Sequence, residues 1–203
     1  MKIYLSDCAG FTEQDLARFF AALPAGRRAY AERCKKTVDR ASAAVGFLLV
    51  VHALRDADPG FSVTDWTLGE YGKPSIPGSP LHFSLSHADG LCAAAVSDKP
   101  IGLDVELVRP LRPALLPRFC TPEEIERCGR DPDLAVELWT RREARAKENG
   151  RGIGQNLVAL PNEGVTSIKL TAHGRSFRLS YTSEEPPETV TFPPEYFVVS
   201  VSS

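Results

Sequence analysis

Two carboxylates, Asp104 and Glu106, carry the strongest chemical signal in the chain, in the segment IGLDVE at residues 101–106. One apolar residue separates them and apolar residues precede them, which predicts a strand, and a strand directs residues i and i+2 to one face. Like charges that close repel each other unless a cation lies between them. Hard oxygen ligands on a rigid strand suit Mg²⁺, which binds through one or two carboxylates together with substrate phosphates. The alternative is an edge strand that carries two solvated acids.

A second group of chemically capable residues lies on a predicted helix at residues 134–148, where Trp139, Glu143 and Lys147 follow one another at intervals of four. This spacing places them on one helix face, with Glu before Lys in the favourable order for an ion pair. Glycines follow at 150 and 152, where we expect the helix to end and the backbone to approach another segment closely. The alternative is a surface ion pair beside a core tryptophan, which contributes at most a few tenths of a kcal/mol.

The elements that must position these residues form an α+β pattern. Apolar alternation predicts strands, and helical periodicity with start signals predicts helices. The segment 186–194 is interpreted as an irregular connection. Each half of the chain carries helices and antiparallel strands, so we expect two similar subdomains, residues 1–99 and 100–203, that pack together. The predicted strands are 1–6, 66–68, 82–85, 91–96, 101–106, 167–171, 176–181 and 196–201, and the predicted helices are 12–23, 41–54, 113–119, one beginning at Thr121, and 134–148.

Composition narrows the class of protein. The chain has 203 residues, which fit one large domain or two small ones, and a net charge of −2, which does not suggest a nucleic-acid binder. No apolar run was expected to span a membrane, and the first residues are interpreted as a strand rather than a signal peptide. The five cysteines are scattered without a Cys-x-x-Cys pair. Such spacing argues against a zinc site or a disulfide framework and favours a reducing, cytoplasmic compartment.

Five stretches, in the same order and with plausible spacing, resemble the surfactin-type 4′-phosphopantetheinyl transferases. Each motif is weak alone, but five in order are highly specific. The opening residues and the closing strand are also similar, so the resemblance spans nearly the whole chain. It implies the fold of that family, in which two α+β halves are related by a pseudo-two-fold axis. The five stretches are YGKP at 71–74, HFSLSH at 82–87, IGLDVE at 101–106, RFCTPEE at 118–124, and the helix from Trp139 through Lys147 to Gly150.

The resemblance also implies a reaction, in which the phosphopantetheine arm of coenzyme A moves to a serine of a carrier protein and 3′,5′-ADP is released. By motif position, Asp104, Glu106 and Glu124 resemble the Mg²⁺ ligands. Glu143 corresponds to the general base that takes the serine proton. Lys147 corresponds to the group that neutralises charge on the phosphate. Phosphoryl transfer of this kind depends mainly on metal and cationic groups.

Four residues are candidates for binding coenzyme A. Lys73 and His87 match family positions that contact it, and their alternatives are a solvated loop lysine and a turn histidine satisfied by backbone. The basic stretch, defined here as residues 27–36, contributes Arg33 and Lys36 as candidates for the 3′-phosphate.

The chain departs from the family pattern at four positions. Arg142 stands where a lysine is common before the catalytic glutamate, and Ser84 replaces a usual asparagine. Ala88 replaces a serine, and Ser42 stands where an arginine often binds the 3′-phosphate. These losses predict an altered 3′-phosphate pocket, in which the basic stretch or Arg40 binds the phosphate instead, or an enzyme that hardly recognises the phosphate.

Three hypotheses follow for function. The first is an active transferase that uses Mg²⁺ and serves an acyl, peptidyl or aryl carrier protein, acting as a cytoplasmic monomer. The second is a degenerate relative that binds coenzyme A or a carrier protein without transfer. The third is a purely structural α+β protein. The complete set of acids together with Glu143 and Lys147 favours the first, because a pseudoenzyme is expected to lose one of them.

Overall fold

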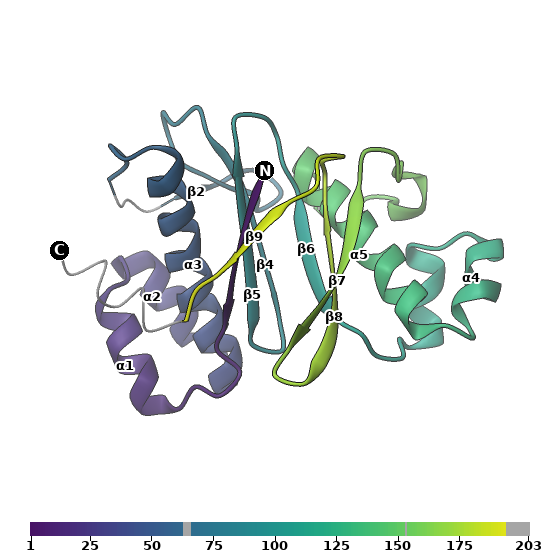
Figure 1. Ribbon diagram of the computed structural model, residues 1–203, viewed down its shortest axis with the longest axis horizontal. Coiled ribbons are helices and arrows are strands. Elements are labelled where there is room, and N and C mark those ends of the chain that lie inside the picture. Colours follow the sequence, from purple (N-terminus) through teal and green to yellow (C-terminus); the bar gives the residue numbers. More distant parts are fainter. Residues whose placement is uncertain (63–65, 153, 194–203) are drawn as a thin grey trace.

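The computed structural model describes residues 1–62, 66–152 and 154–193, and these form an α+β fold (Figure 1). In the first half the elements are β1 (Lys2–Asp7), α1 (Glu13–Ala21), α2 (Ala25–Glu32), α3 (Thr37–Ala57), β2 (Thr67–Leu68), β3 (Pro74–Ser75), β4 (His82–Ala88) and β5 (Leu91–Ser97). In the second half they are β6 (Leu103–Leu107), the 3₁₀ helix η1 (Pro113–Arg118), α4 (Pro122–Cys128), α5 (Pro132–Asn149), the 3₁₀ helix η2 (Leu157–Ala159), β7 (Thr166–Ala172), β8 (Arg175–Tyr181) and β9 (Glu188–Thr191).

The strands form two main sheets that lie next to each other in the middle of the molecule. One sheet has the order β4-β5-β1-β9 and the other the order β6-β8-β7, while β2 and β3 form a separate two-stranded ribbon. Helices α1, α2 and α3 lie on the outer side of the first sheet, and α4 and α5 lie on the outer side of the second (Figure 1). Strands β4 and β6 contact each other, so the two sheets meet there.

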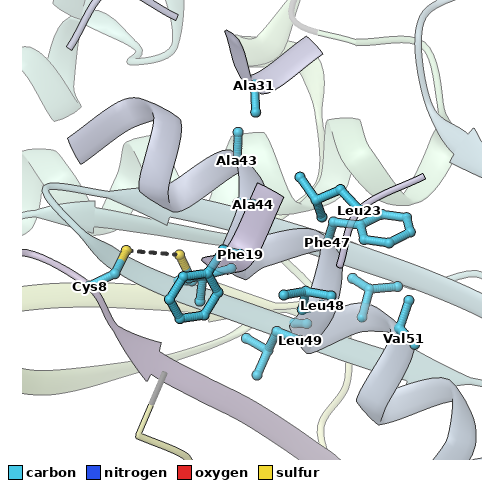
Figure 2. Close-up of a cluster of buried hydrophobic side chains, with 14 of the residues drawn as sticks. Cys8, Phe19, Leu23, Ala31, Ala43, Ala44, Phe47, Leu48, Leu49 and Val51 are labelled. Carbon is cyan, nitrogen blue, oxygen red and sulfur yellow. Dashed lines mark hydrogen bonds between the residues drawn. The ribbon is translucent and has the colours of Figure 1, made fainter. Parts of the chain in front are cut away.

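The alternation of strand side chains explains how the layers pack. On β5, Cys92 and Ala94 belong to the apolar cluster formed with α3, part of which is drawn in Figure 2. The intervening Ala93 and Ala95 belong to the cluster shared with the second sheet. Because successive side chains of a strand point to opposite faces, β5 is apolar on both faces and is buried between two layers. Its small alanines allow both layers to approach closely.

The second sheet divides its faces differently. The odd-numbered residues of β6, and those of β8 from Phe177 to Tyr181, lie in the cluster shared with the first sheet. The even-numbered residues are polar and face α5, as shown by the contacts of Ser180 with Thr140 and of Asp104 with Lys147. The polar candidate residues of β6 therefore lie between the second sheet and α5.

The end of the chain completes the first sheet. Residues 186–194 were interpreted as an irregular connection, but they contain β9, which pairs in parallel with β1 through partners such as Tyr4 and Val190. The β-branched sequence of β9 favours a strand, whereas the flanking prolines masked that signal. The division at residues 99 and 100 stays a prediction, and β9 crosses it. The strand predicted at 196–201 lies outside the described residues.

Helix α3 corrects one sequence expectation. It is long and apolar enough to span a membrane, although no such stretch was expected, but 72% of its most apolar stretch is buried inside the fold. It packs against β5, β4 and β1, which makes it the core helix of the first sheet. Helix α2 was not predicted, because it follows Pro24 without a side-chain cap.

The helix starts predicted from sequence are confirmed. Thr12 and Thr121 each accept a hydrogen bond from the residue three positions later, and both form complete capping boxes, with Asp15 and Glu124 respectively. The helix predicted at 113–119 is a 3₁₀ helix, which contains Pro117. Proline lacks the N–H that a longer α-helix would use.

Candidate functional site

The site begins with a close approach of β6 to α5. A Cβ atom at Gly102 would overlap the carbonyl oxygen of Ala144 and would lie 2.6 Å from the backbone nitrogen of Glu148. Only glycine permits this approach, because it lacks the Cβ that would collide with the helix backbone. The approach brings Asp104, two residues further along, to Lys147 on the next turn of the helix.

Asp104 is held by one of its two carboxylate oxygens. Its Oδ1 accepts a hydrogen bond of 2.7 Å from the Ser86 hydroxyl and one of 2.7 Å from the Lys147 ammonium. Its Oδ2 is buried and has no hydrogen-bond partner among the residues that the structure describes. The side chain is 8% exposed, so the alternative of a solvated acid is wrong for Asp104. A buried carboxylate oxygen without a partner is unfavourable and therefore suggests a ligand that supplies one.

Two glutamates, Glu143 and Glu106, interact electrostatically with Asp104, whose negative charge raises their pKa values. Burial, together with the negative charges of Asp104 and Glu106, raises the pKa of Glu143 to about 7 although Lys147 opposes the rise. Burial and the Asp104 charge also raise the pKa of Glu106. These carboxylates repel one another at partly buried positions, and a bound cation would reduce the repulsion. The cluster of Asp104, Glu106 and Glu143 is called the acid cluster below.

The alternative of a surface ion pair between Glu143 and Lys147 is also wrong. Glu143 is 7% exposed, and the ion pair that Lys147 forms is the one with Asp104. Trp139, the third residue of the predicted helix face, packs on the core, with its ring 5.0 Å from that of Phe119. On this face of α5, Trp139 therefore packs in the core, whereas Glu143 and Lys147 belong to the candidate site.

Glu124, the third predicted metal ligand, has partners of its own. Its Oε2 accepts a 2.8 Å hydrogen bond from the Thr121 backbone, and its Oε1 lies 3.5 Å from the Arg142 guanidinium. Arg142 also donates to the Leu160 carbonyl, so its charge ties α4 and α5 together instead of serving the acid cluster. Within the described ranges, no three His, Cys, Asp or Glu side chains form a ready metal-binding group. The place of Glu124 in a metal site stays a prediction.

A cavity of 330 Å³ is lined by residues from both halves of the chain and reaches Lys147, the ion-pair partner of Asp104. Its size is in the range typical of pockets for small molecules. Lys147 lines it from α5 and His87 from β4, while Lys73 lines it from the loop before β3. Three cationic or potentially cationic side chains from distant parts of the sequence therefore face one space. The rest of the lining is largely apolar or aromatic, with Tyr30, Trp66, Leu68, Tyr71 and Phe83.

Lys73 links the cavity to the end of α5. Its ammonium donates to the backbone carbonyls of Glu148, at 2.8 Å, and Ile101, at 3.4 Å, and thereby satisfies a carbonyl of the last helical turn. Gly150 ends the helix with a φ of 72°, and a Cβ there would lie 3.3 Å from the Lys73 side chain. Burial lowers the pKa of Lys73. The alternative of a solvated loop lysine is wrong, and the expected close approach at the helix end is confirmed.

His87 lies in β4 and not in a turn. Its ring keeps solvent contact at the cavity, yet surrounding protein desolvates it and lowers its pKa, as does the nearby charge of Lys147. Asp39 and Asp104 oppose this shift. A neutral imidazole offers one donor and one acceptor to a ligand in the cavity.

The basic stretch reaches the cavity through a residue that was not singled out from sequence. Arg27 lines the cavity, and its guanidinium lies 4.1 Å from the centre of the Trp66 ring and 4.6 Å from that of Tyr30. Neither Arg33 nor Lys36 belongs to the described lining, so their contact with a ligand stays a prediction. Arg27 and Tyr30 are three positions apart, so they share one face of a helix. A prediction of α2 would therefore have placed them together.

The residues expected to alter a 3′-phosphate pocket lie elsewhere. Ser42 is fully buried, and its hydroxyl lies 3.8 Å from the Cys8 sulfur in the core. Ala88 belongs to the core shared by the sheets, and Arg40 pairs with Glu13 on α1. Neither Ser42 nor Ala88 offers a donor to the described cavity, and the altered 3′-phosphate pocket stays a prediction.

Comparisons with known proteins agree with this geometry. Residues 100–195 match the family model ACPS, described as the 4′-phosphopantetheinyl transferase superfamily. A 4′-phosphopantetheinyl transferase from Bacillus subtilis is 31% identical over 198 residues, which cover 90% of this chain and 86% of the relative. The transferase psf-1 from Bacillus pumilus is 31% identical over 72% of this chain and 68% of its own length. The transferase Sfp from Bacillus subtilis strain 168 is 33% identical over 50% of each chain.

Proposed function

Since this chain belongs to the 4′-phosphopantetheinyl transferase family, we propose that it transfers the phosphopantetheine arm of coenzyme A to a serine of an acyl, peptidyl or aryl carrier protein. The serine oxygen forms a bond to the phosphorus that bears the arm. The bond from that phosphorus to the rest of the pyrophosphate breaks, and 3′,5′-ADP leaves. The observation that carries the proposal is a pair of buried, interacting carboxylates, Glu143 and Asp104, whose cationic neighbour Lys147 lines a cavity.

Glu143 is the proposed general base. A base works best when its pKa lies near the working pH, because it is then ionised often enough and still binds a proton. Burial and the neighbouring carboxylates raise the pKa of Glu143 to about 7. It would take the serine proton directly or through a water molecule. The side chain lies on α5, whose contact with β6 fixes its position.

Asp104 and Glu106 are the proposed Mg²⁺ ligands, with Glu124 as a third candidate. Two carboxylates on one face of β6, one of them with a buried oxygen that lacks a partner, fit a hard cation that prefers oxygen ligands. Bound Mg²⁺ would neutralise charge on the pyrophosphate. The position of Asp104 and Glu106 is set by β6, which is held between the core and α5.

The cationic residues around the cavity are the proposed binding groups for coenzyme A. Lys147 pairs with Asp104 and lines the cavity, so it can neutralise charge where the pyrophosphate meets the acid cluster. Lys73, His87 and Arg27 line the same space and offer donors to phosphate oxygens. Arg33 and Lys36 remain candidates from the basic stretch.

A degenerate relative that binds without transfer is the second candidate. It is not favoured, since Asp104, Glu106 and Glu143 interact as one cluster and Lys147 is paired within it. A chain released from selection for transfer has no reason to keep mutually repelling carboxylates buried. The proposed enzyme is a cytoplasmic monomer, consistent with its five free cysteines, and sedimentation at several concentrations tests the monomeric state.

The test of function is transfer itself. Purified protein is incubated with an apo carrier protein, coenzyme A and Mg²⁺, and intact-mass spectrometry detects the gain of a phosphopantetheine arm on the carrier serine. Panels of acyl, peptidyl and aryl carriers show which class is served. The matched control is the E143Q variant, which keeps the size of the side chain. Binding of coenzyme A without any mass gain on any carrier would establish the degenerate relative instead.

A further inference from the structure

The orientation of Asp104 depends on a serine that the reaction scheme does not use. Ser86 lies on β4, is 8% exposed and donates its hydroxyl to Asp104 Oδ1 at 2.7 Å. It does not belong to the described lining of the cavity, whereas its neighbours Leu85 and His87 do. The Ser86 hydroxyl therefore contacts the acid cluster and is not part of the described lining of the cavity. We infer that Ser86 is a positioning residue, which turns the Asp104 carboxylate so that Oδ2 faces the proposed Mg²⁺.

The strand that carries Ser86 is itself anchored to β6. Two residues earlier, the Ser84 hydroxyl accepts a hydrogen bond of 2.9 Å from the Leu103 backbone nitrogen. This bond sets the spacing and register between β4 and β6 at the residue before Asp104. Because residues i and i+2 of a strand share a face, Ser86 then falls next to Asp104. The hydroxyl that holds the carboxylate is thus supported by a rigid strand.

Lys147 cannot perform this task alone. Its ammonium also lies 2.7 Å from Oδ1, but it is a compact charge on a flexible stem with three rotatable donors. An ammonium follows the carboxylate as it rotates and pairs with either oxygen. If the Ser86 hydroxyl were absent, Oδ2 could turn to Lys147 and would no longer be available to a cation. Groups that orient metal ligands in this manner typically change metal affinity by about 10–100-fold when they are removed.

The inference rests on the proposed metal site, and it is tested by metal binding rather than by turnover alone. Mn²⁺ serves as the probe, and free Mn²⁺ is measured by electron paramagnetic resonance in the full-length protein with saturating coenzyme A. S86A should raise the Mn²⁺ dissociation constant by about 10–100-fold. S86T keeps the hydroxyl and should bind nearly as the wild type does. In assays, S86A should need more Mg²⁺ but approach the wild-type kcat at saturation.

The chain offers a matched control in Ser6. This residue is also a fully buried strand serine, and its hydroxyl has no hydrogen-bond partner in the described part of the chain. S6A therefore removes the same atom without removing a bond, and its Mn²⁺ affinity should stay at the wild-type value. Thermal unfolding of S86A, S86T and S6A shows that each variant is folded before binding is measured.

The outcomes separate this inference from the proposed function. If D104N loses Mn²⁺ binding while S86A binds as the wild type does, the positioning role of Ser86 is refuted and the metal site stands. Equal weakening in S86A and S6A also refutes it, because loss of packing would then explain both. If D104N binds Mn²⁺ as the wild type does, the Asp104 metal site is wrong and the role of Ser86 falls with it.

Discussion

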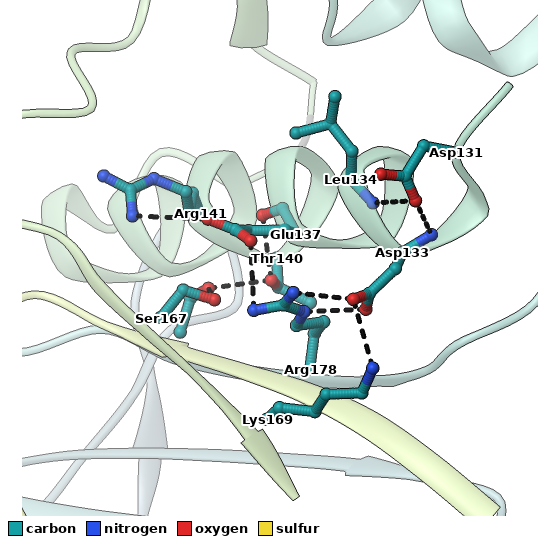
Figure 3. A network of polar contacts seen from close by, with 10 residues as sticks. Asp131, Asp133, Leu134, Glu137, Thr140, Arg141, Ser167, Lys169 and Arg178 are labelled. Carbon is teal, nitrogen blue, oxygen red and sulfur yellow. Dashed lines mark hydrogen bonds and ion pairs between the residues drawn. The ribbon is translucent and has the colours of Figure 1, made fainter. Parts of the chain in front are cut away.

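Both ends of α5 pack charged side chains against the same sheet. At one end the charges are matched by ion pairs, and at the other the carboxylates are not all paired. At the first end, Asp133 accepts hydrogen bonds of 2.8 and 2.7 Å from Arg178 on β8, and Lys169 on β7 lies 3.3 Å from it (Figure 3). Arg178 also lies 3.0 Å from Glu137, one turn further along the helix. Hydrogen bonds from Arg178 lower the pKa of Asp133. Charges of both signs are matched there, and the network joins α5 to the sheet.

At the second end of α5, the carboxylates are only partly matched by ion pairs. The acid cluster of Asp104, Glu106 and Glu143 has Lys147 as the cation that pairs within it, one carboxylate oxygen lacks a described partner, and the pKa values of both glutamates are raised. A network that only holds a helix in place can be satisfied completely. The incomplete pairing at the second end fits the proposed binding of a cation and a phosphorylated ligand, because strongly shifted pKa values gather at functional sites.

Neutral hydroxyls separate the two ends. The hydroxyl oxygens of Thr140 on α5 and Ser180 on β8 lie 2.7 Å apart, and Ser180 donates to Ser167 at 3.1 Å. This short chain satisfies the buried polar groups between the two charged regions without adding charge. The first end can therefore be altered to test stability while the second is altered to test chemistry.

The largest expected effect is the loss of transfer in D104A. A direct metal ligand should matter more than the ~10–100-fold change typical of the groups that support such ligands. We expect transfer to fall below detection in the mass-shift assay, and wild-type protein in excess EDTA to behave in the same way. The control is D133A at the other end of the helix, which should transfer at the wild-type rate. Normal transfer by folded D104A would remove Asp104 from the mechanism.

The next effect is on turnover in E143Q. Glutamine preserves the size of the side chain but cannot accept a proton, so kcat should fall by about 10²–10⁴-fold if Glu143 is a general base. Coenzyme A affinity, measured by calorimetry, should change little. E137Q, on the same helix but within the matched network, is the control and should retain kcat. A kcat for E143Q close to that of the wild type would show that Glu143 does not act in proton transfer.

The acid cluster should also leave a signature in the pH dependence of stability. The folded pKa of Glu143 is raised from 4.5 to about 7, so the folded state binds more protons than the unfolded state between these values. Stability from this group is therefore complete below pH 4.5 and is lost as the pH rises to about 7, a loss on the order of 3 kcal/mol. Urea unfolding in EDTA should show this slope in the wild type and a flatter curve in E143Q. Parallel curves would contradict the burial argument.

The smallest expected effect belongs to the matched network. R178A should lower the free energy of unfolding by about 1.5–3 kcal/mol, the value typical of hydrogen bonds to charged groups, without changing transfer. Because the folded pKa of Asp133 is lowered, its contribution is present above the unfolded pKa and disappears as the pH falls through the folded one. The stability difference between wild type and R178A should thus shrink in acid. A loss of transfer in R178A at unchanged stability would mean that the two ends are coupled.

Much of this protein could be predicted from local sequence. The alternation around Asp104 and Glu106 predicted β6, and the Thr121 capping signal predicted the start of α4, both as observed. These features depend on backbone periodicity and on hydrogen bonds between residues three or four positions apart. Residues close together in the sequence are therefore sufficient to predict them. The order of five motifs was sufficient to identify the family, which the comparisons confirm.

Tertiary structure alone decided the state and partners of the site residues. Lys147 was expected beside Glu143 but pairs with Asp104, 43 positions away, and Lys73 caps a helix end 75 positions away. The burial that raises the pKa of Glu143 comes from the approach of β6 to α5, which a single glycine permits. Desolvation and pairing depend on which surfaces meet, and periodicity along one element does not specify its neighbours.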